Sequence, residues 1–184
     1  DGNRRFAWSK SSTVGLGHSE GKKKLKEVMD WVLDLGIPYF TVYALSTENI
    51  SERGDDELDV LYDLYVSGLN EISEDKRIHD RGVRVQVVGR LDMLPSKVRD
   101  AISHAEEVTS DYSDFTFTVC LAYGGREEIV DAVKSVAVDH ASGNLEVGSI
   151  DSSEITNRMY ASELPDPDLV IRTLSLIHIS EPTR

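Results

Sequence analysis

Apolar residues recur along this chain with two spacings, and the two spacings alternate. A spacing of three to four residues, which buries one side of a helix, covers 22–35, 56–72, 95–108 and 127–141, with a weaker pattern at 152–160. Short runs of β-branched, aromatic and aliphatic residues, which are typical of buried strands, cover 39–45, 83–88, 115–122 and 169–171. Strands that alternate with helices indicate βαβ units. The chain is therefore predicted to be one α/β domain with a mostly parallel sheet that is flanked by helices on both faces.

The loops after the predicted strands carry the polar residues of most interest, because ligands of open parallel sheets bind beyond the carboxyl ends of the strands. These loops are Ser46-Thr-Glu-Asn49, Gly89-Arg90, Tyr123-Gly-Gly-Arg126 and Arg172-Thr173. The first residues, Asp1-Gly-Asn-Arg-Arg5, resemble another loop of this kind. Glycine lets backbone N–H groups approach a ligand closely, and arginine presents a planar fork that fits phosphate.

The net charge makes these arginines informative. The 184 residues include 33 acidic and 20 basic side chains, which gives a formal charge of −13. Such an acidic chain repels a phosphate backbone, so it is not expected to bind nucleic acid. Four of its five strand-end loops nevertheless contain arginine. This pattern predicts a phosphorylated ligand, and the alternative is that each arginine pairs with a surface carboxylate.

Composition also limits the compartment and the kind of site. No apolar run approaches the roughly 20 residues needed to span a membrane, and no secretory leader is recognisable, so we expect a cytoplasmic protein. Cys120 is the single cysteine, which excludes an internal disulfide and a thiolate metal site. The segment from Gly15 to Gly21 resembles a dinucleotide loop, but its third glycine comes one residue late and no strand is predicted before it.

Asp1 is the natural candidate for a metal ligand. Mg²⁺ is commonly held by one or two carboxylates together with substrate phosphates. The alternative is that Asp1 caps the helix that follows, and spacing alone favours the cap.

Five motifs along residues 1–173 resemble those of the cis-prenyltransferases, which include the undecaprenyl diphosphate synthases. They are Asp1-Gly-Asn-Arg-Arg-Phe-Ala, Gly17-His18, Tyr43-Ala-Leu-Ser-Thr-Glu-Asn49, Tyr123-Gly-Gly-Arg-Glu-Glu-Ile and Pro165-Asp-Pro-Asp-Leu-Val-Ile-Arg-Thr173. The motifs follow the family's order. Phe6 and the pair Leu94-Pro95 are most similar to the archaeal-type branch.

The resemblance implies a parallel sheet of about six strands, a homodimer and Mg²⁺ as the cofactor. It implies condensation of an allylic prenyl diphosphate with isopentenyl diphosphate to a Z-polyprenyl diphosphate, a product that enters membranes while the protein is at most associated with their surface. Asp1 resembles the catalytic aspartate that binds the metal, and Asn49 resembles the residue that takes part in removing a proton from isopentenyl diphosphate. The implied substrate-binding residues are Gly2, Asn3, Arg4 and Arg5 for the allylic diphosphate, with Phe6 and His18 beside them, and Ser46, Thr47, Glu48, Arg53 and Arg172 around isopentenyl diphosphate.

The chain also departs from the family pattern. Asn49-Ile-Ser-Glu-Arg53 has one residue more than the family's Asn-Trp-x-Arg and lacks its aromatic residue, so the role of Arg53 stays open. After Thr173 the family continues with Gly-Gly-Glu and an Arg-x-Ser phosphate-binding segment, which residues 174–184 do not match. We therefore expect a cis-prenyltransferase domain at 1–173 that is truncated at both ends, and an artefactual tail at 174–184. The expected consequence is that this chain by itself has weakened activity or none.

A different class of function competes with the enzyme. A non-catalytic partner subunit of a cis-prenyltransferase would share the same fold. The intact Asp1-Gly-Asn loop and Asn49 favour the enzyme, because a supporting subunit has no need of them.

Overall fold

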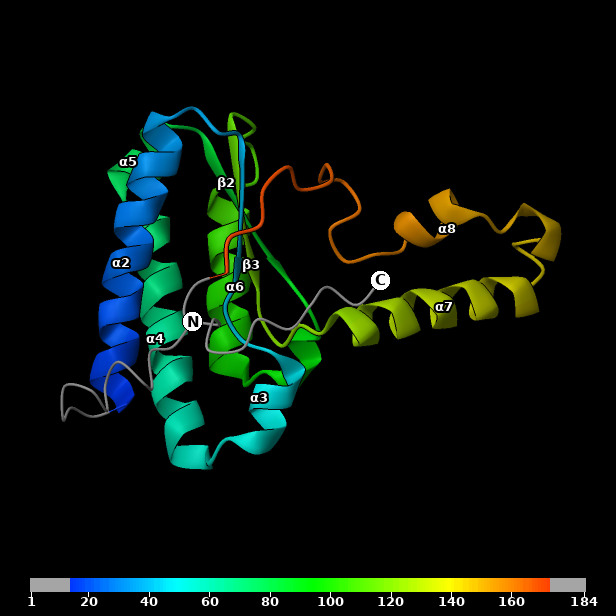
Figure 1. Ribbon diagram of the computed structural model, residues 1–184, viewed down its shortest axis with the longest axis horizontal. Helices are drawn as coiled ribbons and strands as arrows, with labels where there is room; N and C mark the ends of the chain where they lie inside the picture. Colours follow the sequence, from blue (N-terminus) through cyan, green and yellow to red (C-terminus); the bar gives the residue numbers. More distant parts are fainter. Residues whose placement is uncertain (1–13, 173–184) are drawn as a thin grey trace.

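The structure is a computed structural model that describes residues 14–172, and its centre is a parallel sheet of three strands (Figure 1). Across the sheet in the order β1-β3-β2, the strands are β1 (Tyr39–Tyr43), β3 (Phe115–Cys120) and β2 (Val83–Val88). Phe40 of β1 and Val85 of β2 both lie opposite Phe117 of the central strand. Because the strands are parallel, their carboxyl ends meet at one edge of the sheet.

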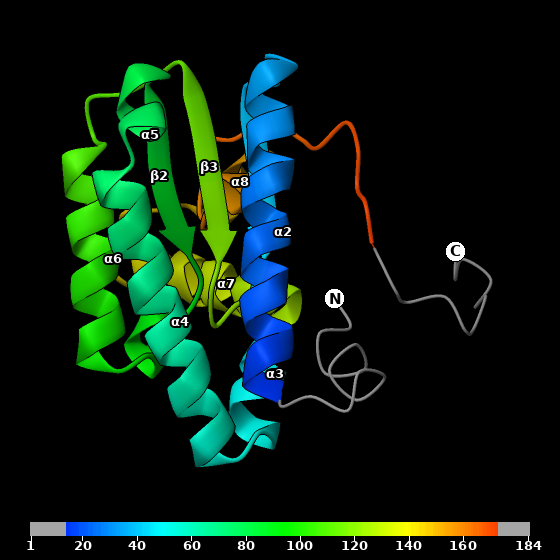
Figure 2. The ribbon, with the colours of Figure 1, turned by 90° about the vertical axis from the view of Figure 1, so that its left-hand side faces the viewer.

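Three helices cover one face of this sheet (Figure 2). They are α2 (Val14–Asp34), α4 (Asp55–Glu74) and α6 (Ser96–Val108). The core beneath them contains Leu61 of α4, Val98 of α6 and Val85 of β2, each at most 3% exposed. A second cluster joins Met29 of α2 to Phe117. Burial of each such side chain contributes about 1.5–3 kcal/mol, so apolar packing fixes these helices on the sheet.

The other side of the sheet has a different cover. α7 (Gly125–Ala141) starts at the carboxyl ends of the strands and extends away from the sheet, and α8 (Ser152–Thr156) packs on it (Figure 1). Tyr39 and Tyr43 of β1 are 48% and 61% exposed. Flanking helices are thus confirmed, but within residues 14–172 only one face has helices packed along it. Two short 3₁₀ turns, η1 (Leu91–Met93) and η2 (Val147–Ser149), complete the elements.

Three of the four predicted strands are confirmed, and the prediction of a strand at 169–171 is wrong for this structure. Leu169, Val170 and Ile171 are 75%, 78% and 76% exposed. A strand needs a neighbour to pair with its N–H and C=O groups, and this segment pairs with none of residues 14–172. The described residues therefore form three strands where the resemblance implies about six.

The chain also forms helices that the hydrophobic pattern did not indicate. α3 (Thr47–Glu52) and α5 (Lys76–Asp80) are too short to display a helical period. The helix predicted at 22–35 begins at Val14, so the glycine-rich segment before it is helical too. A Cβ atom at Gly15 would lie 3.4 Å from Val60. Close packing of α2 on α4 there outweighs the poor helix propensity of glycine, which costs about 1 kcal/mol per residue.

Candidate functional site

The ends of β2 and β3 lie so close together that they form a rigid base for the predicted site. Gly89, directly after β2, has a φ of 136°, and a Cβ atom there would be 1.9 Å from the carbonyl oxygen of Leu121. Ala122 has a φ of 49°, which costs a residue with a side chain roughly 1–2 kcal/mol. The N–H of Arg90 donates to the carbonyl of Ala122 at 3.0 Å and helps to hold it. Strained backbone persists where the surroundings over-determine it and is concentrated at functional sites.

Tyr123 joins the loop after β3 to the beginning of α3. Its carbonyl oxygen accepts hydrogen bonds from the N–H of Thr47 at 3.2 Å and from the hydroxyl of Tyr43 at 2.9 Å. Ser46 forms a parallel bridge with Tyr123, and its Oγ caps α3 by accepting from the N–H of Asn49 at 3.0 Å. Ser46 and Thr47 are both 7% exposed. Their contacts in this structure therefore shape the loop, whereas Glu48 in the first turn of α3 is exposed.

A chain of polar contacts links three of the predicted site residues through a carboxylate. Arg53 donates from Nε and Nη2 to Oδ1 of Asn49, both at 3.3 Å, and from Nη1 to Oε1 of Glu57 at 3.0 Å. Nε2 of His18 lies 3.6 Å from the same Glu57 oxygen. The side chains of Arg53, Glu57 and His18 are 14%, 17% and 11% exposed. α2, the end of α3 and the first turn of α4 thus bring His18, Asn49 and Arg53 together.

These contacts fix which end of the Asn49 amide faces Arg53. Arginine can only donate hydrogen bonds, so the atom of Asn49 that faces Arg53 is the carbonyl oxygen. The NH₂ group is then the end available to a ligand. An amide NH₂ is a donor that suits a phosphate oxygen.

The arginines of the other strand-end loops differ in their partners. Arg90 forms a bidentate pair with Asp131, with both N–O distances at 2.8 Å. The hydrogen bonds from Arg90, and then from Tyr160, lower the pKa of Asp131 to about 2. Arg126 and Arg172 are exposed and form no ion pair with any residue in 14–172. Among residues 14–172, pairing with a carboxylate therefore describes Arg90 and Arg53, while Arg126 and Arg172 have no carboxylate partner in that part of the chain.

Two ionisable side chains at this edge of the sheet, those of Cys120 and Tyr160, stay neutral near pH 7. Burial, with an added effect of the Glu128 charge, raises the pKa of the Cys120 thiol to about 11. Burial and the hydrogen bond to Asp131 raise the pKa of Tyr160 to about 12. Neither group supplies a thiolate or phenolate nucleophile. This edge can therefore bind and orient anions through hydrogen-bond donors and cationic side chains.

Several predicted site residues fall on parts of the chain that the structure leaves undescribed. Asp1, Gly2, Asn3, Arg4, Arg5 and Phe6 lie outside residues 14–172. Among residues 14–172, no group of three or more histidine, cysteine, aspartate or glutamate side chains could hold a metal ion. No helix of the same part of the chain is long and apolar enough to cross a membrane.

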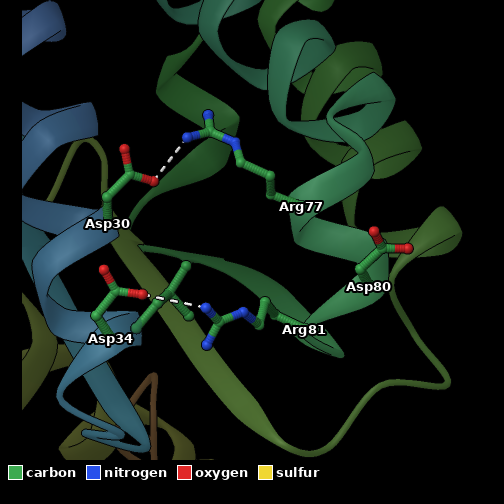
Figure 3. Close-up of a pocket in the computed structure, with 6 residues that line it drawn as sticks. Asp30, Asp34, Arg77, Asp80 and Arg81 are labelled. Atoms are coloured by element: carbon green, nitrogen blue, oxygen red, sulfur yellow. Dashed lines mark hydrogen bonds and ion pairs between the residues drawn. The ribbon is translucent and has the colours of Figure 1, made fainter.

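One surface cavity lies away from the carboxyl ends of the strands. It has a volume of about 380 Å³ and lies between the end of α2 and α5 (Figure 3). Two ion pairs cross it, Arg77–Asp30 at 2.7 Å and Arg81–Asp34 at 3.1 Å. Because its arginines are already paired, this cavity has the character of a contact between helices.

Comparison with known proteins decides the family. A family model described as "Putative undecaprenyl diphosphate synthase" matches residues 1–181. The chain belongs to this family. It is 47% identical over 180 residues to the tritrans,polycis-undecaprenyl-diphosphate synthase (geranylgeranyl-diphosphate specific) of Pyrococcus horikoshii, and these residues are 98% of this chain and 68% of the relative. The Methanopyrus kandleri protein of the same name is 47% identical over 173 residues, 94% of this chain and 64% of the relative.

Solved structures agree with this assignment to the undecaprenyl diphosphate synthase family. Lavandulyl diphosphate synthase from Lavandula x intermedia, in complex with dimethylallyl diphosphate, matches with a TM-score of 0.80 and 30% identity over 87% of this chain and 67% of that one. A probable undecaprenyl diphosphate synthase from Campylobacter jejuni matches with a TM-score of 0.65 and 28% identity, over 78% of this chain and 65% of that one. The resemblance to cis-prenyltransferases, the archaeal affinity and the α/β fold are confirmed.

Sequence reasoning missed four residues that hold the site. Glu57 contacts both Arg53 and His18 and so connects α4 to the two other elements. A signal was present, because Glu57 follows Arg53 by four residues, a spacing at which opposite charges pair. Glu128, Asp131 and Tyr160 were also missed. Glu128 lies in the Tyr123–Ile129 motif and three residues before Asp131 on α7, but nothing local in the sequence connects either carboxylate to Tyr160.

Proposed function

We propose that this member of the undecaprenyl diphosphate synthase family elongates prenyl chains by adding isopentenyl diphosphate to an allylic prenyl diphosphate with Z geometry. The observation that supports this most is the convergence of His18, Asn49 and Arg53 at the carboxyl edge of the sheet. Cleavage of an allylic C–O bond places negative charge on the departing diphosphate. Fixed donors and cations aimed at that charge lower the barrier.

For the allylic substrate, geranylgeranyl diphosphate is the first candidate. The names of the Pyrococcus horikoshii and Methanopyrus kandleri relatives specify that compound, and the structurally similar lavandulyl diphosphate synthase was solved with the shorter dimethylallyl diphosphate. A prenyl chain also needs an apolar space. Partly buried side chains beside the core offer apolar surface on and next to the helix that carries His18. They include Leu25 and Val32 of α2 and Val42 of β1.

The proposed substrate-binding residues form two groups, one for each substrate. The loop Asp1–Phe6 and His18 hold the allylic diphosphate. Asn49 binds an oxygen of isopentenyl diphosphate through its NH₂ group and orients this substrate for proton loss, since an amide is no base itself. The remaining groups around that second substrate are Ser46, Thr47, Glu48, Arg53 and Arg172.

We further propose Mg²⁺ as the cofactor, with Asp1 as its protein ligand. One carboxylate together with substrate phosphates fits the preference of this ion. When bound, Mg²⁺ stabilises the charge of the departing diphosphate. His18 and Arg53 then have the separate task of keeping the substrates in place beside it.

The same proposal includes the domain limits, the assembly and the location. Residues 1–173 form the cis-prenyltransferase domain, and 174–184 lie outside it. A homodimer is supported by the apolar side of α7, where Ile129, Val130 and Val133 are 52%, 46% and 51% exposed. Apolar patches of this kind are typical of protein interfaces. We propose a cytoplasmic enzyme that is at most associated with a membrane surface and whose product enters membranes.

Condensation with radiolabelled isopentenyl diphosphate tests the proposal. Two chains are compared: the 184 residues as printed, and residues 1–173 joined to the C-terminal segment of the Pyrococcus horikoshii relative. With geranylgeranyl diphosphate and Mg²⁺, the joined chain is expected to form an extractable labelled product, and Asn49→Ala is expected to abolish most of it. Binding of the allylic diphosphate without product in either chain would favour the non-catalytic partner subunit.

A further inference from the structure

Two carboxylates of α7 hold residues from several segments that meet at the strand ends. Glu128 is 6% exposed. One of its oxygens accepts from the hydroxyl of Tyr123 at 2.6 Å, and the other accepts from the backbone N–H of Tyr160 at 2.8 Å. Asp131, nearly one helical turn further on, accepts from Arg90 and from the hydroxyl of Tyr160 at 2.5 Å. Tyr160 is therefore held twice, through its backbone and through its side chain.

Aromatic contacts extend this arrangement across the sheet edge. The rings of Tyr160 and Tyr123 meet edge to face with centroids 6.2 Å apart, and those of Tyr123 and Tyr43 meet in the same way at 5.5 Å. Such pairs contribute about 0.5–1.5 kcal/mol beyond the area they bury. The contacts connect α7, the loop after β2, the loop after β3, the end of β1 and the segment after α8.

One further hydrogen bond connects these contacts to the proposed substrate site. The carbonyl of Tyr123 accepts from the N–H of Thr47, the first residue of the helix that carries Asn49. Ala122, the residue before Tyr123, has the strained φ of 49° and is fully buried. A strained residue stays in place only where its neighbours hold it firmly. The contacts of Arg90 and Tyr123 on either side supply that hold.

We propose that Asp131 and Tyr160 are positioning residues that fix the strand-end loops and thereby the start of α3 with Asn49. They act through Arg90, Glu128 and Tyr123 and touch no substrate themselves. The inference rests on the proposed function, because it assumes that the placement of Asn49 serves the second substrate, isopentenyl diphosphate. His18 lies on α2 and reaches Asn49 only through Glu57 and Arg53, so we expect binding of the allylic diphosphate to depend much less on Asp131 and Tyr160.

The same helix provides a matched control. Asp139, eight residues after Asp131, accepts from Arg158 at 2.6 Å, and Arg158 also binds Glu154 of α8. This pair is again an arginine held by an α7 aspartate, but it joins α8 to the far part of α7 (Figure 1). Loss of Asp139 is expected to loosen α8 alone.

Hydrogen–deuterium exchange of the 184-residue chain tests the proposal with Asp131→Ala, Tyr160→Phe and Asp139→Ala. Because each of the first two variants removes a charge-assisted bond, exchange in 44–50 should become about tenfold faster, while exchange in 22–33 of α2 stays unchanged. Asp139→Ala should accelerate exchange in 152–158 only, and Asp131→Glu should restore most of the protection. The affinity for geranylgeranyl diphosphate should stay within about twofold of the unmodified chain, because its proposed partners lie elsewhere.

Two results would overturn the inference. The first is unchanged exchange in 44–50 for both Asp131→Ala and Tyr160→Phe. The second is equal acceleration in 44–50 and 22–33, which would show general loosening of the fold. Failure of the unmodified chain to bind geranylgeranyl diphosphate would instead contradict the proposed function, and the exchange pattern would still decide the positioning role.

Discussion

Removal of the Arg53 side chain should destabilise the protein by a measurable and predictable amount. The guanidinium is 14% exposed, forms one charge-assisted bond to Glu57 at 3.0 Å and shares two longer bonds with a single Asn49 oxygen. Because the donor in every one of these bonds is the charged guanidinium, each contact falls in the range of about 1.5–3 kcal/mol for a hydrogen bond to a charged group. Arg53→Ala should therefore lower the free energy of unfolding by at least about 2 kcal/mol, which corresponds to a Tm roughly 4 °C lower or more for a chain of this size.

Urea unfolding of a double-mutant cycle measures the part that belongs to the Arg53–Glu57 contact. Arg53→Ala, Glu57→Gln and the double variant are compared with the unmodified chain, and Arg84→Ala serves as the control because Arg84 is exposed on β2. We expect a coupling free energy of about 1 kcal/mol or more and almost no change for Arg84→Ala. Additivity of the two substitutions within about 0.5 kcal/mol would refute the contact as a stabilising link between α3 and α4.

Three further predictions concern the backbone at the strand ends and the pH dependence of stability. Gly89→Ala should strongly destabilise the fold or prevent folding, because its Cβ would be 1.9 Å from the Leu121 carbonyl oxygen; circular dichroism melting checks this, and a Tm equal to that of the unmodified chain would contradict it. Ala122→Gly should raise the free energy of unfolding by about 0.5–1 kcal/mol, because glycine accepts a positive φ without strain, and a loss of stability in urea unfolding would contradict it. The hydrogen bond from Lys22, supported by Lys26, lowers the pKa of Glu71 from 4.5 to about 2, so its stabilisation is present above pH 4.5 and is lost as the pH falls towards 2. Glu71→Gln should then reduce the difference in the free energy of unfolding between pH 6 and pH 2.5, measured in urea, by less than about 1 kcal/mol because the pair is exposed, and an unchanged difference would refute the link.

The strands that were predicted correctly are those whose hydrophobic and polar pattern is explained by burial of the strand in the sheet. Val83–Val88 alternates valine with polar residues and matches a strand with one face on the core, as β2 has. Leu169–Ile171 is also rich in β-branched and aliphatic residues but is exposed, because strand formation also depends on a neighbouring edge. That neighbour is a property of the tertiary structure. No local pattern reports it.

The residues of the candidate site can also be divided into those that the sequence indicated and those that it did not. His18 and Asn49 could be found because they belong to motifs with a fixed spacing. Arg53 could be named only as a residue displaced by one position from its motif, and Glu57 could have been found from its spacing to Arg53. Asp131 and Tyr160 could not, because 29 residues separate them and they meet only after α7 and α8 have folded. The strained φ of Ala122 is equally invisible in the sequence, since alanine gives no indication of a left-handed backbone.

Equilibrium binding by isothermal titration tests the central claim most directly. The account predicts that the chain binds geranylgeranyl diphosphate in the presence of Mg²⁺ and that geranylgeraniol, which lacks the diphosphate, binds at least about tenfold more weakly, since each lost charge-assisted bond is worth 1.5–3 kcal/mol. NAD should not compete, because the glycine-rich segment that resembles a dinucleotide loop lies inside α2. Tight binding of NAD together with no affinity for the prenyl diphosphate would contradict the account.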